Sequence, residues 1–482
     1  LSLLLAVTGC GNVSKSTVAF EPAETNSLRA PAYPLVTIDP YTSAWSFSDK
    51  LNEEETKHWT GKSFPLLGGI RVDGKSYRFM GREEIPLLPV LETAASTKWE
   101  GFYTEKKPAG NWMAADYQPT GWGKGVGAFG TDENPNRETV WNSRDIWVRR
   151  SFDLTEDVSK ESLFLKFSHD DNIEIYINGI EVATTGRGLN YDLIKEIPAE
   201  VTATLKPTGN VIAAHCMNDV GGGYVDFGIM KKVKRGDTFE AKAEQLSANV
   251  LPTQTFYTFR CGPVDLDVIF TAPMLMDDLN VMTSPFNYLT YQVRSTDGAS
   301  HDVQIYVEAT PQWAVDKIEQ PVTFEKGSKN GISYLKTGTT EQAVLGKKGD
   351  DLRIDWGYFY LASPENSSTA LKLNSYYDSK KEFMTTGTLS PEAGRTSEDM
   401  QKEMTVLAFT DNLGKVGDKK TGGHLMIGYD DLYAIQYFND NRMAYWKQDG
   451  KVDIYKAFES GERTYQEMMK RCGEFDKQMM AD

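Results

Sequence analysis

Residues Ala30–Gly81, APAYPLVTIDPYTSAWSFSDKLNEEETKHWTGKSFPLLGGIRVDGKSYRFMG, determine how this chain begins to fold. Val36–Ile38 and Gly69–Val72 are predicted strands, because each is a short apolar run bounded by turn-forming residues. Asp73-Gly74 follows the second strand and predicts a two-residue hairpin turn, since this dipeptide tolerates positive φ. The residues between the two strands then form a long loop, and such loops in compact domains commonly carry function.

That loop concentrates rings and polar groups that suit a polar substrate. The candidate substrate-binding residues on it are Asp39, Tyr41, Trp45, His58 and Trp59. Aromatic faces and an imidazole favour contact with a polar ligand. For the two tryptophans, a purely structural role in the core is the alternative.

The composition is typical of a multidomain globular protein. With 482 residues the chain is too long for one ordinary core, so two or three domains are expected. A hydrophobic fraction of 40%, with 23 Tyr, 22 Phe and 10 Trp, argues against disorder. The net charge of −16 argues against a nucleic-acid partner, because phosphate binding draws on clustered Lys and Arg.

The N-terminus is similar to a lipoprotein signal. Leu1–Val7 is an apolar run too short to span a bilayer, and small residues lead from it into Cys10. We therefore predict that Cys10 is lipidated, that residues 1–26 are a signal and tether, and that the protein is extracytoplasmic and touches the membrane only through this lipid anchor. A buried N-terminal strand with an incidental cysteine is the alternative.

The remaining cysteines do not form a motif. Cys216, Cys261 and Cys472 are far apart and lack metal-ligand spacing, so we predict small buried side chains without a disulfide framework. No metal site and no cofactor is expected. The sequence also lacks a CxxC or HExxH motif and a Ser–His–Asp order, so no catalytic residues are assigned.

The rest of the chain is predicted to be almost entirely β, in segments of different texture. Strands of period two at Ile146–Phe152, Leu163–Phe167 and Ile173–Ile177, the last followed by the turn Asn178-Gly179, predict a jelly roll over residues 96–235. It is inserted between residues 27–95 and 236–450, whose many strands predict two packed sheets. Lys326–Lys336 and Leu345–Asp351 are predicted exposed hairpin loops.

The opening stretch resembles the glutaminase A-like family. The segments that carry the resemblance are Pro34–Val36, Asp39–Tyr41, Trp45–Leu51, His58–Gly61 and Arg71–Lys75. The resemblance implies one large super-sandwich formed by residues 27–95 and 236–450, followed by an (α/α)6 toroid of the six-hairpin glycosidase type as the partner domain in the same protein. It also implies hydrolysis of glutamine to glutamate and ammonia by the complete protein.

A second resemblance concerns the inserted segment, which is similar to galactose-binding-like jelly rolls. The residues that carry it are Trp141, Ile146–Arg150, His169–Asp171, Tyr176–Gly179 and Gly209–His215.

Two acidic motifs allow a functional and a structural interpretation. His169-Asp170-Asp171 contains metal-ligand and acid–base residue types, but a turn leading into a strand is favoured. Asp430-Asp431 lies in a block that resembles a family signature, so both residues are candidate substrate-binding residues at a domain junction. The alternative is a pair at a helix N-terminus, where carboxylates complement the dipole.

The C-terminal residues 451–482 predict a helix that leads into the toroid. Ile454, Phe458, Tyr465, Met468, Cys472, Phe475 and Met479 recur at three and four residues, which places them on one stripe. Gly461 predicts a break between two helical pieces. The stripe is still running at Asp482, so we expect further helices to cover it.

The predicted fold class is therefore all-β: a large super-sandwich with an inserted jelly roll and a C-terminal helical linker. The predicted function is the non-catalytic N-terminal region of a surface glutaminase A-like hydrolase, acting on a small polar substrate or a glycan. The alternatives are the same region of a glycoside hydrolase, and a glycan-binding module. Whether the chain itself is an enzyme stays open.

Overall fold

The computed structural model describes residues 18–26, 29–83, 87–232, 239–347, 352–392, 397–398 and 404–481. The chain forms two compact units, residues 1–84 with 236–482 (unit 1) and residues 85–235 (unit 2). Cys10 and most of the predicted signal lie outside the described residues. No helix in the described ranges is both long and apolar enough to cross a membrane.

Unit 1 is a β-sandwich. Its six-stranded sheet contains, in spatial order, β17 (Ala241–Lys242), β4 (Lys75–Met80), β3 (Leu66–Val72), β22 (His301–Ala309), β28 (Thr405–Val416) and β26 (Thr369–Ser375). Its nine-stranded sheet contains β18 (Glu244–Val250), β19 (Gln254–Cys261), β20 (Val264–Thr271), β21 (Phe286–Ser295), β29 (Thr421–Asp430), β25 (Tyr358–Pro364), β24 (Ile332–Thr339), β23 (Val322–Lys329) and β27 (Ser397–Glu398). One hydrophobic core joins the facing sides of both sheets. The all-β sandwich is thus confirmed.

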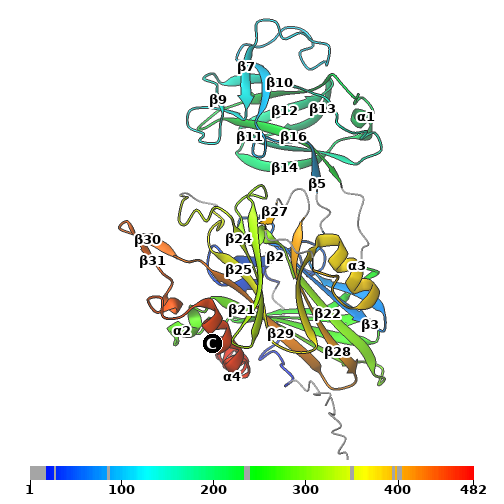
Figure 1. Ribbon diagram of the computed structural model, residues 1–482, viewed down its shortest axis with the longest axis vertical. Coiled ribbons are helices and arrows are strands. Elements are labelled where there is room, and N and C mark those ends of the chain that lie inside the picture. The colour runs from blue at the N-terminus through cyan, green and yellow to red at the C-terminus, as the bar shows by residue number, and fades with distance from the viewer. Residues whose placement is uncertain are drawn as a thin grey trace, which may run out of the picture. The chain divides into compact units, whose positions relative to one another are not determined.

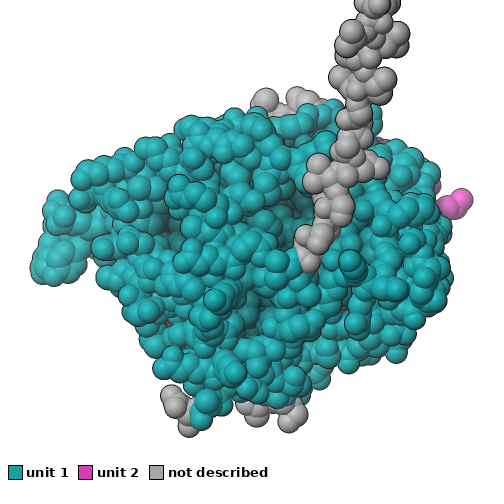
Figure 2. Space-filling model, turned by 90° about the horizontal axis from the view of Figure 1, so that it is seen from below, with its two compact units in different colours: residues 1–84, 236–482 teal, residues 85–235 magenta. Residues whose placement is uncertain are grey.

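Short elements surround this sandwich. They are the two-stranded sheet of β1 (Tyr33–Thr37) and β2 (Ser43–Ser46), the hairpin of β30 (Ile435–Tyr437) and β31 (Asp440–Arg442), and the helices η1 (Pro311–Ala314), α2 (Leu279–Met282), α3 (Tyr376–Thr386), η2 (Tyr445–Lys447) and α4 (Ile454–Ala481). Figure 1 shows the β30–β31 hairpin extending away from the sheets. Figure 2 shows unit 1 from below, where its teal surface is hollowed in several places.

Unit 2 also consists of two sheets. One contains β13 (Ile180–Thr185), β12 (Asn172–Ile177), β15 (Asn210–Met217), β10 (Asp145–Phe152), β6 (Trp99–Thr104) and β7 (Gly123–Gly127). The other contains β14 (Asn190–Glu196), β11 (Leu163–Asp170), β16 (Tyr224–Lys232), β8 (Phe129–Gly130), β9 (Thr139–Val140) and β5 (Leu87–Leu91); α1 (Ala199–Thr202) is a single turn. Because β5 pairs with β16, residues 87–91 belong to unit 2, whereas the sequence analysis assigned them to the sandwich.

Two of the predicted hairpin turns are confirmed. Asp73 and Gly74 have φ of 48° and 93° and join β3 to β4, and Asn178 and Gly179 have φ of 48° and 91° and join β12 to β13. The predicted exposed hairpin over Lys326–Lys336 is confirmed, but its loop is shorter than the predicted range. β23 and β24 run through it and turn at Asn330-Gly331, where φ is 55° and 77°, so the Asn-Gly signal outweighs the charge-rich composition.

Helix α4 differs from its prediction in two ways. It continues through Gly461 without a break, because the glycine gives room to Phe286: a Cβ there would lie 2.4 Å from Phe286 Cζ. Its apolar stripe packs on the outer face of the nine-stranded sheet, against residues such as Phe286 and Tyr288 (Figure 1, red). The stripe is therefore covered within this chain up to Cys472, while Met479 is 45% exposed. Its burial does not call for further helices.

Candidate functional site

A tight turn between β1 and β2 organises most of the predicted site residues. Asp39 Oδ1 accepts hydrogen bonds from the backbone N–H groups of Tyr41 and Thr42, both at 2.8 Å. Pro40 fits the position after Asp39, because proline presets the φ that such a turn needs. Burial raises the pKa of Asp39, against the lowering effect of its two backbone hydrogen bonds.

His58 and Trp59 both bind the carbonyl of Pro40. His58 Nε2 donates to this oxygen at 3.0 Å and Trp59 Nε1 at 2.7 Å. His58 Nδ1 accepts from the N–H of Thr60, which fixes the proton on Nε2. His58 is completely buried, so it supports the turn, whereas the indole of Trp59 is 51% exposed and available for contact.

Trp45 does not join this group. Its indole N–H donates to Ser43 Oγ at 3.2 Å, and its backbone pairs with Lys57. Trp45 lies within β2 and is partly buried. These contacts agree with the structural alternative for this tryptophan.

The aromatic part of the site is completed by a residue that the sequence analysis missed. The ring of Tyr41 meets the edge of Trp356 at 5.4 Å between centroids and an angle of 67°. Trp356 is buried and donates its indole N–H to the carbonyl of Tyr433 at 3.2 Å. The turn after β1 and the segment after β29 are thereby held against the same indole.

Asp430 is the last residue of β29 and Asp431 follows it, and the two side chains have different environments. Asp430 Oδ1 accepts from Lys447 Nζ at 2.5 Å and from the N–H of Leu432 at 2.9 Å. Asp431 is only 6% exposed, and its Oδ1 has no hydrogen-bond partner among the described residues. The interpretation of this pair as a helix N-terminus is wrong, because α4 begins only at Ile454.

The charge state of Asp431 is unusual. Burial, together with the charges of Asp39 and Asp430, raises its pKa to about 7. The contacts of Trp356 with Tyr41 and with the carbonyl of Tyr433 show that the turn after β1 and the end of β29 are neighbours, although they lie far apart in sequence. At neutral pH, Asp431 can therefore act as a hydrogen-bond donor or as an acceptor.

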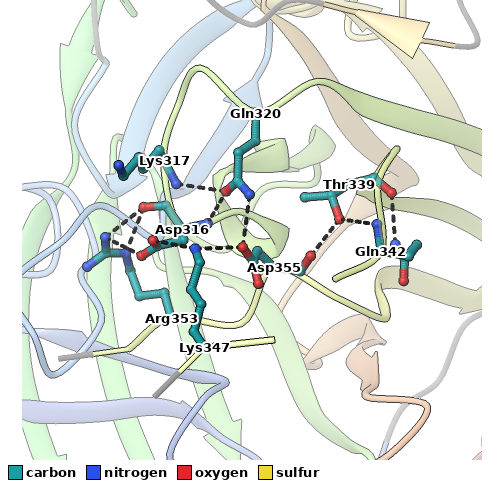
Figure 3. A network of polar contacts seen from close by, with 8 residues as sticks. All are labelled: Asp316, Lys317, Gln320, Thr339, Gln342, Lys347, Arg353 and Asp355. Carbon is teal, nitrogen blue, oxygen red and sulfur yellow. Dashed lines mark hydrogen bonds and ion pairs between the residues drawn. The ribbon is translucent and has the colours of Figure 1, made fainter. Parts of the chain in front are cut away.

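Asp355 is a second buried carboxylate at this end of the sandwich and was also missed. It is 2% exposed; its Oδ2 accepts from Lys347 Nζ at 2.7 Å and from Gln320 Nε2 at 2.9 Å (Figure 3). Its Oδ1, like that of Asp431, has no partner in the described part of the chain. Charged residues that alternate with Ile354 and Trp356 could equally mark an exposed strand, so the sequence carries no signal that this carboxylate is buried.

A wider polar network holds Asp355 in place. Figure 3 shows Lys347 between Asp316 and Asp355, with 2.7 Å from Nζ to Asp316 Oδ2. Arg353 donates to the carbonyl and the carboxylate of Asp316, at 2.6 and 2.7 Å from Nη2. Thr339 donates to the carbonyl of Asp355 at 2.6 Å. The segment before β25 is thus fixed by side chains from three neighbouring loops and strands.

We call Asp39, Tyr41, Asp355, Trp356 and Asp431 the acidic–aromatic cluster. Its two unpartnered carboxylate oxygens can accept hydrogen bonds from a hydroxyl, an amide NH2 or an ammonium group. Among the described residues, no group of three or more His, Cys, Asp or Glu side chains is arranged to hold a metal ion.

The other acidic motif has a structural role. β11 runs to Asp170 and β12 starts at Asn172, so His169 and Asp170 lie within a strand rather than in the predicted turn. Asp171 Oδ2 accepts from the N–H groups of Asp219 and Val220, at 2.8 and 3.1 Å, and holds the loop before β16. Cys216, Cys261 and Cys472 are buried and free, as predicted.

Comparison with known proteins finds similarity over parts of the chain. Two family models match, both described as domains of unknown function: DUF5127 over residues 253–482 and DUF4964 over residues 4–92. The glutaminase A of Aspergillus oryzae is 28% identical over 196 residues, which are 40% of this chain and 28% of that protein. This similarity relates the matched region to a hydrolase.

Solved structures add little. A crystal structure of Ruminococcus gnavus beta-glucuronidase matches at 9% identity with a TM-score of 0.25, over 61% of this chain and 47% of that one. The apo structure of the same enzyme matches at 10% identity with a TM-score of 0.24, over 60% and 46%. Values this low do not establish a shared fold.

Proposed function

We propose that unit 1 is the N-terminal, non-catalytic β-sandwich region of a hydrolase similar to glutaminase A, which in its complete form converts glutamine to glutamate and ammonia. The observation that carries this proposal is the 28% identity to glutaminase A over 196 residues. The matched part is 28% of the relative's length, so the remaining domains, including the (α/α)6 toroid that we expect to hold the catalytic residues, belong to the proposal.

In this proposal the acidic–aromatic cluster contributes to the substrate site. Asp431 and Asp355 each present one unpartnered oxygen, and a glutamine offers an amide NH2 and an ammonium group as donors. A buried acceptor that is matched by a donor gains a charge-assisted hydrogen bond, while the same acceptor left empty costs free energy. The substrate therefore supplies what these carboxylates lack.

The exposed apolar residues of the β30–β31 hairpin support a neighbouring domain. Tyr437 and Phe438 of the hairpin are 56% and 83% exposed, and Tyr445 of η2, which follows it, is 57% exposed; all three are close in sequence to Asp430 and Asp431. Exposed aromatic side chains in one short segment are typical of an interaction surface. We propose that this hairpin contacts the toroid at the side of the cluster.

The test uses the complete protein and measures ammonia released from L-glutamine. Asp431→Asn should raise KM for glutamine about tenfold, because it weakens one charged hydrogen bond. Asp418→Asn, which changes an exposed aspartate in the turn between β28 and β29, is the matched control and should leave KM unchanged. Absence of ammonia release by the unaltered complete protein would contradict the proposal.

A glycoside hydrolase is the second candidate. The exposed indole of Trp59, anchored on Pro40 beside the carboxylates, is the observation that favours a sugar substrate, because aromatic faces stack on sugar rings. Release of reducing sugar from glycosides, without ammonia release from glutamine, would support this candidate instead.

We also propose that the protein is extracytoplasmic and anchored by a lipid on Cys10. Metabolic labelling with a fatty-acid analogue should label the complete protein, and Cys10→Ala should abolish the label. A labelled Cys10→Ala variant, or an unlabelled parent protein, would contradict the anchor.

A further inference from the structure

A hollow of unit 1 lies at the end of β29 that is remote from the acidic–aromatic cluster. It is a cavity of about 250 Å³ between β21, β29, the β25–β26 connection and α4. Gly422 borders the cavity and Asp430 belongs to the other end of the strand, about 26 Å away at ~3.3 Å per residue. The cavity is therefore distinct from the acidic–aromatic cluster.

Two glycines shape this cavity. A Cβ at Gly422 would lie 1.9 Å from the backbone oxygen of Tyr291, so only glycine lets β29 approach β21 here. A Cβ at Gly423 would lie 2.7 Å from the Tyr291 hydroxyl and 3.2 Å from Asp411 Oδ2. The space beside these two polar groups exists because a side chain is missing at residue 423.

Helix α4 and the N-terminal segment form the remaining walls. The His424 ring stacks on Tyr465 at 3.6 Å and 14°, and His424 Nε2 contacts Glu462 at 2.7 Å. Phe20 meets the edge of Tyr465 at 5.8 Å, and its N–H donates to Gln292 Oε1 at 3.0 Å. The walls thus combine aromatic rings with hydroxyl, amide and carboxylate groups.

The charges of the lining restrict the ligand. Among the described residues, neither Lys nor Arg lines the cavity, so this part of the chain offers no Lys or Arg cation to a phosphate or carboxylate ligand there. Asp411 already accepts from the hydroxyls of Tyr291 and Ser368, both at 2.7 Å, and Glu462 is bound by His424. A ligand with many hydroxyl groups and no charge fits this lining, because hydroxyls both donate to the carboxylates and accept from the amides.

The cavity adjoins a second, larger hollow on the same unit. This groove of about 910 Å³ shares Asn366 and Thr369 with the cavity. The groove is lined by Ser328, Ser333 and Ser367 and by charged side chains that already have partners. Lys326 pairs with Glu392 at 3.1 Å, Lys372 Nζ donates to the carbonyls of Leu389 and Ser390, and Glu365 accepts from the hydroxyl of Ser328. A chain-like ligand can therefore place its end in the cavity and its following units along this hydroxyl-rich groove.

From this geometry we infer that unit 1 binds the end of a neutral oligosaccharide, with one sugar ring in the cavity beside His424 and Tyr465 and the next rings in the groove past Asn366 and Thr369. A volume of about 250 Å³ is below the ~300–1,000 Å³ of sites for drug-sized ligands and suits a single ring. The inference does not rest on the proposed hydrolase function, since it concerns the opposite end of β29.

The experiment measures binding of tetrasaccharides to the full chain by calorimetry. The probes are neutral cello-, malto- and N-acetylchito-tetraose, anionic tetragalacturonate and cationic tetraglucosamine. At least one neutral probe should bind, and tetragalacturonate should bind at least about tenfold more weakly. Failure of all neutral probes to bind, or equal or tighter binding of either charged probe, would overturn the inference.

Three single substitutions test whether the tetrasaccharide binds in the cavity and groove described above. Thr369→Trp fills the passage between cavity and groove and should weaken the neutral probe at least about tenfold. Thr184→Trp, the same exchange at an exposed site of β13 in unit 2, is the control and should leave binding within about twofold. Gln466→Ala removes an exposed lining amide of α4 without risk to the fold and should weaken binding about threefold, through one hydrogen bond. Unchanged affinity for the neutral probe in both Thr369→Trp and Gln466→Ala would contradict binding at this site. If Thr369→Trp does not fold, the affinity of Gln466→Ala alone decides.

Discussion

Lys380 and Glu308 beneath α3 are each 2% exposed, and Asp355 and Asp431 near the end of β29 are 2% and 6% exposed, yet the two pairs are built differently. Lys380 Nζ lies 2.7 Å from Glu308 Oε1 and donates to the carbonyl of Tyr376 at 2.6 Å. The other oxygen of Glu308 accepts from the hydroxyl of Tyr306. Both charges of this pair are thus opposed by a partner.

Asp355 and Asp431 are only partly satisfied: Asp355 has a cation, Lys347, on its Oδ2, but its Oδ1 and the Oδ1 of Asp431 have no hydrogen-bond partner among the described residues. Asp431 faces other acidic groups and raises its pKa to about 7 instead of finding a cation for its free oxygen. A buried charge without a partner costs several kcal/mol, so a chain retains it only where something other than stability is gained. Depth of burial alone therefore does not distinguish a closed ion pair, such as Lys380 with Glu308, from a carboxylate that keeps one oxygen without a partner, such as Asp431.

The largest expected effect is the loss of the closed pair. Lys380→Met leaves Glu308 buried without its cation and should lower the free energy of unfolding by about 3–5 kcal/mol. Urea denaturation measures this change. The double variant Lys380→Met with Glu308→Leu should recover most of it, because an apolar replacement of both charges is often neutral. Equal losses in the single and the double variant would show that the pair is not the cause.

Removing the carboxylate of Asp431 should change the free energy of unfolding in the opposite direction, towards higher stability. The unfolded pKa of an aspartate is about 3.9 and the folded pKa of Asp431 is about 7, so stability falls as pH rises from about 4 to 7, where only the unfolded state ionises. Asp431→Asn removes this penalty and should stabilise the protein at pH 7.5 by about 2–4 kcal/mol.

The neighbour Asp430 provides the contrast for this prediction. Asp430→Asn breaks the bond to Lys447 and should destabilise the protein at the same pH. Urea denaturation of both variants between pH 4 and 8 decides the matter. A steep loss of stability on raising pH that persists in Asp431→Asn would show that another group carries the raised pKa.

A smaller change in stability is expected from replacing either of two glycines of α4, Gly461 and Gly473, which differ in what surrounds them. A Cβ at Gly461 would lie 2.4 Å from the Phe286 ring, while a Cβ at Gly473 would meet nothing within 4 Å. Gly473→Ala should stabilise the helix by up to about 1 kcal/mol, because alanine is the better helix former. Gly461→Ala should destabilise by about 1–3 kcal/mol despite the same gain. Thermal unfolding compares the two, and equal signs would contradict the packing of α4 on the sheet.

Sequence reasoning found the elements whose signals are local. The Asp-Gly and Asn-Gly turns and the period-two strands predict the hairpins correctly, because turn chemistry and alternation depend only on neighbours in the chain. The break predicted at Gly461 failed for the opposite reason. The glycine is set by a ring on β21, and a contact across such a distance leaves no mark in the helix sequence.

The candidate site shows the same limit. Asp39, Tyr41, His58, Trp59, Asp430 and Asp431 were singled out from two segments, and the structure brings these segments together at one end of the sandwich. Trp356 and Asp355 complete the group but were missed, since nothing local distinguishes them from residues of an ordinary strand. Which carboxylate oxygen lacks a partner is a property of the assembled loops and is not accessible from sequence.

The smallest expected effect concerns His301, whose ring has ion-pair partners like Lys380 but, like Asp431, has a shifted pKa. His301 Nδ1 contacts Asp73 Oδ2 at 2.6 Å and its Nε2 contacts Asp297 Oδ1 at 3.0 Å, so the ring links the β3–β4 turn to the start of β22. These two carboxylates, Asp297 first, raise the pKa of His301 above its usual 6.5.

The sign of the effect follows from this shift. The protonated ring stabilises the fold fully below about pH 6.5 and loses that contribution as pH rises through the raised folded pKa. The same contacts lower the pKa of Asp297 to about 2, so the acidic side of the link weakens only well below pH 4. His301→Gln should therefore be less stable than the parent at pH 5.5 and nearly equal to it at pH 8.5. Lys415→Met, which removes the adjacent exposed ion pair with Asp302, should keep the pH dependence. Thermal unfolding at both pH values measures the difference in stability. If His301→Gln is equally destabilised at pH 5.5 and pH 8.5, the ring acts by packing as a neutral group and not as a cation between two carboxylates.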